Sequence, residues 1–198
     1  MRPRDKEIVK SLQKFRCMSR NQIAKIFFSN LKNPITSANF VLKRLRRENL
    51  IEVNEDIQPF VYFPKPSIIK RNSQKMQHYL AIVDFFIELC EIERPSIYEV
   101  EKRCNNGNIQ PDVYMIWQDD VYFVEIQLSR YSTKVMKKKL NRYVHYFSTE
   151  EWRGKILPAN NEPYVWIVSR TPYSIHREDL TIIQTSINRF ATSQKGKS

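Results

Sequence analysis

Apolar residues recur at two different spacings along the chain, and these spacings separate helical from strand segments. Over residues 5–15, 20–28 and 36–48 the apolar positions return every three or four residues, which is typical of helices that bury one face. Residues 51–53 and 60–63 alternate in the manner of strands. Residues 1–64 therefore predict three short helices followed by a β-hairpin, which is the element order of a winged helix-turn-helix.

The rest of the chain predicts a second domain over residues 74–191, joined to the first by a proline-containing linker over residues 65–73. Its expected elements are a long helix over 74–93, strands over 97–103, 109–117 and 121–128, a helix over 131–148, a strand over 164–169 and a last helix over 175–190. Residues 192–198 are polar and predict a disordered tail.

The hairpin over residues 109–128 carries the most chemical information. Asp112 lies near its start, and Glu125 and Gln127 lie late on its second strand, where alternation puts both on one face. Pairing about a turn at residues 118–120 places Asp112 roughly opposite them, and a hard divalent cation relieves the repulsion between two such carboxylates. The hairpin thus predicts a metal site of the kind that cuts phosphodiesters. The alternative is an exposed acidic hairpin, but a charge within the apolar run around Glu125 is costly without a partner.

Charge is distributed unevenly along the chain. The net charge is +12, and residues 1–70 contribute 15 Lys and Arg against 6 Asp and Glu. This excess indicates a polyanionic partner, with nucleic acid first and a solvated basic face as the alternative. Three glycines exclude a glycine-rich phosphate loop, and the three cysteines lack the spacing of a zinc site. No apolar run suggests a signal peptide or a membrane span, so we expect a cytoplasmic protein.

The third predicted helix is the candidate to enter the DNA major groove. Its outward residues are Ser37, Asn39, Phe40, Lys43, Arg44 and Arg47. Asn39 and Arg44 are suited to base edges, whereas Lys43, Arg46 and Arg47 are suited to phosphates. The predicted wing is acidic and fits the DNA backbone poorly, so a winged helix used for protein pairing is the alternative.

The pattern Pro111-Asp112 followed by Glu125-Ile126-Gln127 resembles the PD-(D/E)XK nuclease superfamily. The resemblance implies Mg²⁺ or Mn²⁺ bound by Asp112, Glu125 and the backbone carbonyl of Ile126. It also implies a further acid from the preceding helix, for which Glu88 is the candidate and a solvated acidic stripe the alternative. The lysine of the superfamily corresponds to Gln127, which forms hydrogen bonds but carries no charge.

A basic row follows on the helix over residues 131–148. Lys134, Lys138 and Arg142 recur at every fourth position. One role for this row is to bind the phosphate backbone of the substrate. In another, Lys138 or Arg142 points inward and supplies the positive charge that Gln127 lacks. The alternative is an ordinary solvated helix face.

The whole order of elements resembles the replication-relaxation family of plasmids and other mobile elements. The residues that carry this resemblance are the Arg4-Asp5 helix start, the run from Leu42 to Ile51, His78, Pro111-Asp112 and Glu125. It implies an α+β fold, in which a winged helix-turn-helix precedes a PD-(D/E)XK restriction-endonuclease-like core with a mixed sheet. It also implies binding of double-stranded DNA and a part in replication or DNA relaxation.

Two functions from different classes fit these expectations. In the first, the protein nicks or cuts DNA with Mg²⁺, Asp112 and Glu125 hold the metal, and Gln127 orients the attacking water. In the second, the protein is a non-catalytic replication accessory or transcriptional regulator, and the core serves for dimerisation or for gripping DNA. A second copy of the chain and other replication or mobilisation proteins are candidate partners in both.

Overall fold

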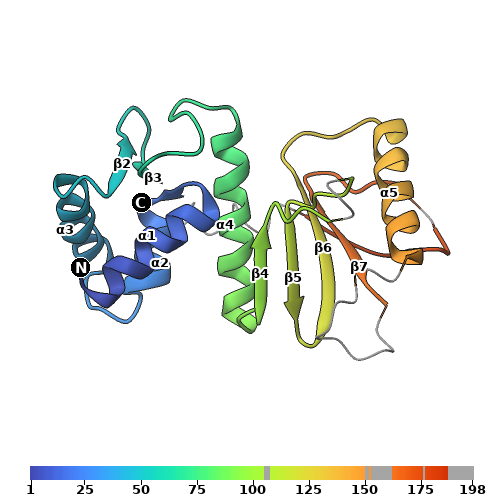
Figure 1. Cartoon of the computed structure of the whole chain (residues 1–198), viewed down its shortest axis with the longest axis horizontal. Helices are drawn as coiled ribbons and strands as arrows, with labels where there is room; N and C mark the ends of the chain where they lie inside the picture. The colour runs from blue at the N-terminus through green and yellow to red at the C-terminus, as the bar shows by residue number, and fades with distance from the viewer. Residues whose placement is uncertain (105–107, 150–151, 153–161, 176, 187–198) are drawn as a thin grey trace. The chain divides into compact units, whose positions relative to one another are not determined.

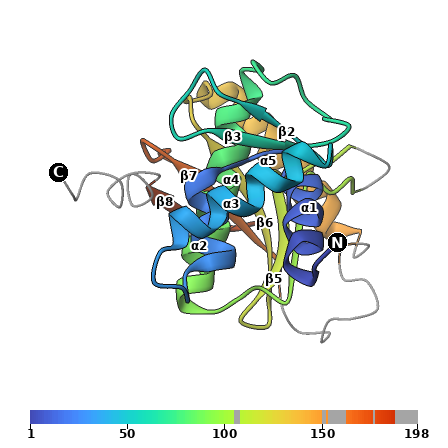
Figure 2. The ribbon, with the colours of Figure 1, turned by 90° about the vertical axis from the view of Figure 1, so that its left-hand side faces the viewer.

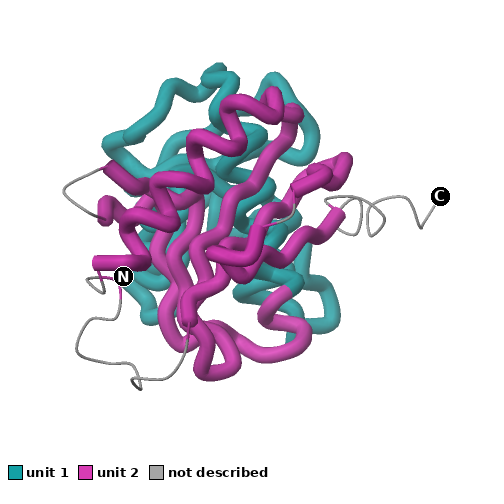
Figure 3. The backbone as a smooth tube through the Cα atoms, turned by 90° about the vertical axis from the view of Figure 1, so that its right-hand side faces the viewer, with its two compact units in different colours: residues 1–88 teal, residues 89–198 magenta. Residues whose placement is uncertain are grey.

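The computed structural model describes residues 1–104, 108–149, 152, 162–175 and 177–186, and it divides into two compact units (Figure 3). The units comprise residues 1–88 and 89–198, so the division falls inside helix α4 (Lys75–Ile92). The expected linker over residues 65–73 and the domain limits on either side of it stay predictions. The expected disordered tail over residues 192–198 lies outside the described residues.

The first unit contains three helices and a small antiparallel sheet before α4 (Figure 2). The helices are α1 (Pro3–Phe15), α2 (Arg20–Phe28) and α3 (Pro34–Arg47), and the strand order is β1 (Met18–Ser19), β3 (Val61–Pro64), β2 (Ile51–Asn54). Ile8, Leu12, Ile23, Leu42 and Leu45 are fully buried, which confirms the apolar faces expected from the helical spacing.

The helix ends of this unit follow local rules. Ser19 caps α2 in a capping box with Gln22. α3 begins at Pro34, not at Thr36 or Ser37, because proline is already set in the helical φ and loses no hydrogen bond at the first helical position. Asn49 follows α3 with a φ of 62°, as expected for a left-handed terminator.

The second unit is built on a five-stranded mixed sheet with the order β4-β5-β6-β7-β8. The strands are β4 (Ile97–Val100), β5 (Val113–Trp117), β6 (Asp120–Gln127), β7 (Tyr164–Ser169) and β8 (Thr181–Ser186). β4, β5 and β6 pair antiparallel, whereas β6, β7 and β8 pair parallel. Helix α5 (Thr133–Ser148) packs on one face of the sheet through Met136, Leu140 and Tyr143 (Figure 1). The expected α+β class with a mixed sheet is confirmed.

The end of the second unit differs from the sequence prediction. The helix expected over residues 175–190 is wrong over Thr181–Ser186, which form β8 beside β7, and residues 187–190 lie outside the description. Thr181, Ile182, Ile183 and Thr185 are β-branched, and such residues fit a pleated strand better than a helix. Among the described residues, no helix is both long and apolar enough to cross a membrane.

Candidate functional site

The β5–β6 hairpin brings the two predicted acids together. Gln118 and Asp119 have φ values of 51° and 64°, so a tight two-residue turn joins the strands and pairs Val113 with Val124. Asp112 therefore stands beside Glu125, and its Oδ2 accepts a hydrogen bond from the backbone N–H of Ile126 at 2.7 Å. The local register thus produces the carboxylate pair that the sequence predicted.

Glu125 is buried, and α5 satisfies both of its carboxylate oxygens. Its side chain is 1 % exposed. The Tyr143 hydroxyl donates to Oε1 at 2.5 Å, and the Lys139 ammonium donates to Oε2. Lys139 and Tyr143 are four residues apart, so one turn of the helix presents both to the same carboxylate. A cation and a hydroxyl are thereby held against the acid that the hairpin supplies.

Burial and charge act against each other at this pair. Burial raises the pKa of Glu125 to about 7, with Asp112 adding to the rise and Lys139 opposing it. Burial, the largest single influence, lowers the pKa of Lys139, but the charge and hydrogen bond of Glu125 together with nearby acidic groups leave that pKa raised. Asp112 also acts on Lys139 in the raising direction. Lys139 is therefore a fixed ammonium that faces two carboxylates, one of which takes up a proton near neutral pH.

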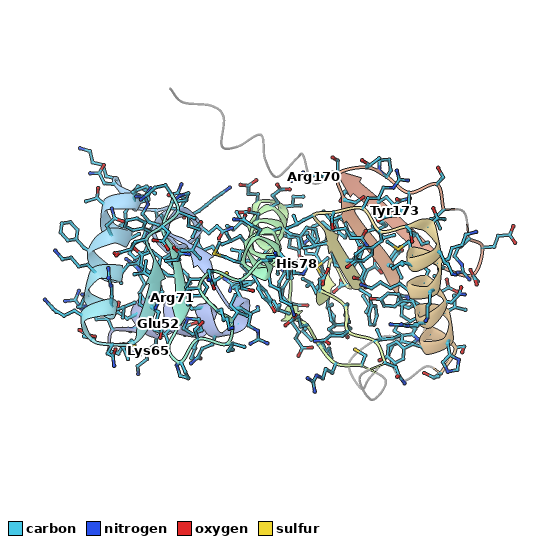
Figure 4. All side chains as sticks on the ribbon, turned by 90° about the horizontal axis from the view of Figure 1, so that it is seen from above. Glu52, Lys65, Arg71, His78, Arg170 and Tyr173 are labelled. Atoms are coloured by element: carbon cyan, nitrogen blue, oxygen red, sulfur yellow. The ribbon has the colours of Figure 1, made fainter. Side chains whose placement is uncertain are left out.

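Gln127 lies two residues beyond Glu125 on the same face of β6. Its Oε1 accepts a hydrogen bond from the hydroxyl of Tyr173, which is a buried member of the core under α5 and is labelled in Figure 4. Its Nε2 is buried and has no hydrogen-bond partner among the described residues. A buried donor left unpaired is costly, so this atom is a candidate to receive a ligand.

The basic row on α5 does not supply the inward charge. Lys134, Lys138 and Arg142 are all exposed, and the residue that reaches Glu125 is Lys139, not Lys138 or Arg142. The reason is helical geometry, because Lys139 lies three residues after Met136 and four before Tyr143, both of which are buried. This position at the border of the apolar stripe is the feature of the sequence that would have identified Lys139.

The donors present fit a magnesium ion. Within the described ranges no group of three or more His, Cys, Asp or Glu side chains is placed to hold a metal. Mg²⁺ nevertheless uses one or two carboxylates, keeps several waters and takes further oxygens from a substrate phosphate. Asp112 and Glu125, with the carbonyl of Ile126, match that demand. Glu88 belongs to the first unit and these two acids to the second, so its expected metal role stays a prediction.

The predicted DNA-binding helix α3 presents part of the expected set to solvent. Asn39, Phe40, Lys43, Arg46 and Arg47 are exposed, and Ser37 is half-buried. Phe40 is 72 % exposed, as its place on the outward face of the helix predicts.

Two arginines of α3 are engaged within the first unit. Arg44 Nη2 binds Asp5 Oδ2 of α1 at 2.6 Å, and Arg46 pairs with Glu55 in the segment between β2 and β3. Arg44 thus holds α3 to α1, and its expected role at base edges stays a prediction. Pairing with Arg46 also neutralises part of the acidic charge of the predicted wing.

Comparison with known proteins finds a family model that matches part of the chain. Residues 65–158 match the model described as Replication-relaxation. No curated protein matches the chain. Among solved structures, the small subunit of the heterodimeric restriction endonuclease R.BspD6I is similar at 14 % identity with a TM-score of 0.33, over 61 % of this chain and 79 % of that one. The predicted resemblance to the replication-relaxation family is thus confirmed over residues 65–158, the segment that contains Asp112, Glu125, Lys139 and Tyr143.

Proposed function

We propose that this protein binds double-stranded DNA of a plasmid, phage or other mobile element, acts in its replication or relaxation, and nicks or cuts it with Mg²⁺ or Mn²⁺. The observation that carries the proposal is the ammonium of Lys139 on Glu125, beside Asp112. The resemblance to PD-(D/E)XK nucleases implies a lysine at the position of Gln127, and here α5 supplies a lysine that contacts the Glu125 carboxylate.

Each residue of the site has a defined task in this proposal. Asp112, Glu125 and the Ile126 carbonyl hold the metal, which when bound lowers the pKa of its water and offsets charge on the phosphate. Lys139 favours the ionised form of Glu125 that a metal ligand requires, against the effect of burial. The hydroxyl of Tyr143 fixes the orientation of the same carboxylate. Gln127 donates from Nε2 toward the reacting phosphate or water.

The first unit is the DNA-binding part in this proposal and works as a winged helix-turn-helix. Its support is the exposed face of α3, where Asn39, Phe40, Lys43 and Arg47 reach solvent together, and the positive charge of residues 1–70. Asn39 is suited to an adenine edge and Phe40 to a thymine methyl group, while Lys43 and Arg47 are suited to phosphates. Lys134, Lys138 and Arg142, exposed on α5, extend the contact to the backbone at the site of cutting.

The rival function is a non-catalytic replication accessory or regulator. The burial of Glu125 favours it, because a carboxylate that is 1 % exposed and hydrogen-bonded at both oxygens is stable without a metal. In this rival, the second unit is a scaffold for dimerisation, for gripping DNA, or for binding other replication or mobilisation proteins.

Incubation with supercoiled plasmid that carries the native locus separates the two functions. We expect nicking or cutting by the wild type in Mg²⁺ or Mn²⁺ and none by Asp112→Asn or Glu125→Gln, both of which keep the side-chain shape. Glu99→Ala removes an exposed carboxylate from β4 of the same sheet and should cleave normally. A wild type that protects a DNA footprint but leaves the plasmid intact would exclude the nuclease and favour the rival.

A further inference from the structure

Gln127 contains an unpaired donor in an otherwise paired site. Its side chain is 5 % exposed and its Nε2 has no partner within the described part of the chain. Glu125 lies two residues away on the same face of β6, and Lys139 and Tyr143 already bind its two oxygens. We therefore expect a bound ligand to supply the hydrogen-bond acceptor for the side-chain N–H groups of Gln127.

The orientation of the Gln127 amide is fixed by Tyr173. The Tyr173 hydroxyl accepts the backbone N–H of Tyr131 at 2.8 Å, so its single proton is available for one further bond. That proton goes to Oε1 of Gln127. An amide turned by 180° would place its NH₂ against a hydroxyl that has already accepted one hydrogen bond, and it would leave the hydroxyl proton without an acceptor. The contact therefore favours the orientation in which the oxygen faces Tyr173 and Nε2 faces away.

Tyr173 is itself held from β8. Gln184 Oε1 accepts the backbone N–H of Tyr173 at 2.8 Å, and Gln184 Nε2 donates to the Tyr173 carbonyl at 3.1 Å. The guanidinium of Arg130 lies 5.2 Å from the centre of the Tyr173 ring. These contacts hold the backbone of Tyr173 and pack against its ring. The position of the Tyr173 hydroxyl relative to Gln127 is therefore fixed.

We propose that Tyr173, clamped by Gln184, is a positioning residue that aims Nε2 of Gln127 at a phosphate oxygen of DNA bound beside Asp112 and Glu125. The acceptor is a phosphate because its oxygens accept hydrogen bonds and because a divalent cation held by Asp112 and Glu125 would draw it to this face of the hairpin. A glutamine held in this way gives a directed donor where a lysine would give a charge with no fixed direction. This inference rests on the proposed function, since it requires DNA at the hairpin.

The contact can be measured without cleavage. NMR of ¹⁵N-labelled full-length protein follows the Nε2 protons of Gln127, assigned by their loss in Gln127→Leu, as a short DNA duplex is added in Ca²⁺. We expect these resonances to shift in the wild type and in Tyr164→Phe, a tyrosine control on β7, and to stay in place in Tyr173→Phe. Amide resonances of α3 should respond alike in all three. Unmoved Gln127 resonances in the wild type, or an equal shift in Tyr173→Phe, would overturn the inference.

Cleavage kinetics give a second reading and separate the inference from the proposed function. Tyr173→Phe should lower kcat by about 10- to 100-fold with little change in KM, because the donor is misplaced and not removed. In a Gln127→Lys background the same change should cost less than about threefold, since an ammonium has no oxygen end to orient. Equal losses in both backgrounds would make Tyr173 a purely structural residue. A wild type that never cleaves would refute the nuclease alone, and the NMR shifts would still decide the phosphate contact.

Discussion

Each unit contains an ion pair whose acidic side chain is buried, and the two pairs differ in what surrounds them. In the first unit Arg44 of α3 binds Asp5 of α1, with side chains 24 % and 4 % exposed. In the second, Lys139 of α5 binds Glu125 of β6, with side chains 27 % and 1 % exposed. By burial alone the pairs are nearly equal, so burial does not distinguish a structural pair from a functional one.

Their neighbours do distinguish them. The Asp5–Arg44 pair joins two helices of one core, and its second acidic neighbour, Glu48, is an exposed residue one helical turn away. The Glu125–Lys139 pair stands beside a second strand carboxylate, Asp112, and beside the unpaired donor of Gln127. A buried ion pair indicates a site when unsatisfied groups of matching chemistry accompany it.

Replacing the cation of each pair by methionine tests this contrast most strongly. Lys139→Met should lower kcat for plasmid cleavage by about 100- to 1000-fold, because Glu125 then favours its protonated form and no longer serves as a metal ligand. Arg44→Met should leave kcat at saturating DNA near the wild-type value. It should lower the free energy of unfolding by about 3–5 kcal/mol, because the buried carboxylate of Asp5 loses its partner. Single-turnover cleavage and urea unfolding of both variants are the measurements.

The stability of Lys139→Met adds a control. Its loss should be smaller than that of Arg44→Met, since Glu125 takes up a proton readily when its cation is gone. Cleavage at the wild-type rate by Lys139→Met would mean that the Glu125–Lys139 pair, like the Asp5–Arg44 pair, only stabilises the fold. That result would contradict the proposed role of Lys139 in cleavage.

Much of the fold could be predicted from the sequence because its determinants are local. The apolar faces of α1, α2 and α5 repeat at helical spacing, and Asn49 and the β5–β6 turn act within a few residues. β8 was missed because Leu180, Ile183 and Ile187 also fit a helical spacing. What makes Thr181–Ser186 a strand is pairing with β7, which no local pattern contains.

The contrast between local and long-range determinants also explains which parts of the candidate site could be predicted from the sequence. Asp112 and Glu125 face each other through hairpin register, which the sequence specifies. Which lysine of α5 reaches Glu125 depends on how the helix is rotated on the sheet, and a one-residue error moves the side chain by about 100°. Tyr173 contacts Gln127 from 46 residues further along the chain, so only the folded structure brings the two together.

The pH dependence of stability tests whether Glu125 is as buried as its contacts indicate. Its pKa is raised from 4.5 to about 7, so the folded state holds this proton more tightly than the unfolded state does. The resulting stabilisation is complete below pH 4.5 and is lost as pH rises toward 7, by on the order of 3 kcal/mol. The difference in unfolding free energy between the wild type and Glu125→Gln should fall by that amount across this range. Asp84, whose pKa burial also raises, is present in both proteins and cancels.

Cleavage should change with pH in the opposite direction. A metal ligand must be ionised, so the rate at fixed Mg²⁺ should rise as Glu125 loses its proton. Chemical unfolding and cleavage measured at the same series of pH values check both trends. A stability difference that does not change with pH would mean that Lys139 keeps Glu125 ionised throughout, and the site would then be formed at every pH tested.

The smallest expected effect concerns DNA binding by the first unit, where Arg47 and Arg44 form a matched pair on one helix. Arg47 is exposed, whereas the guanidinium of Arg44 is held by Asp5. Arg47→Gln should weaken binding a few-fold and reduce the slope of log affinity against log salt by about 1, because one phosphate contact and its released counterion are lost. Arg44→Gln should leave the slope unchanged once variants are compared at a temperature where both are folded. The reverse result would mean that DNA binding breaks the Asp5–Arg44 pair and turns Arg44 toward a phosphate of the DNA, which would make this ion pair a resting state of the DNA-binding surface.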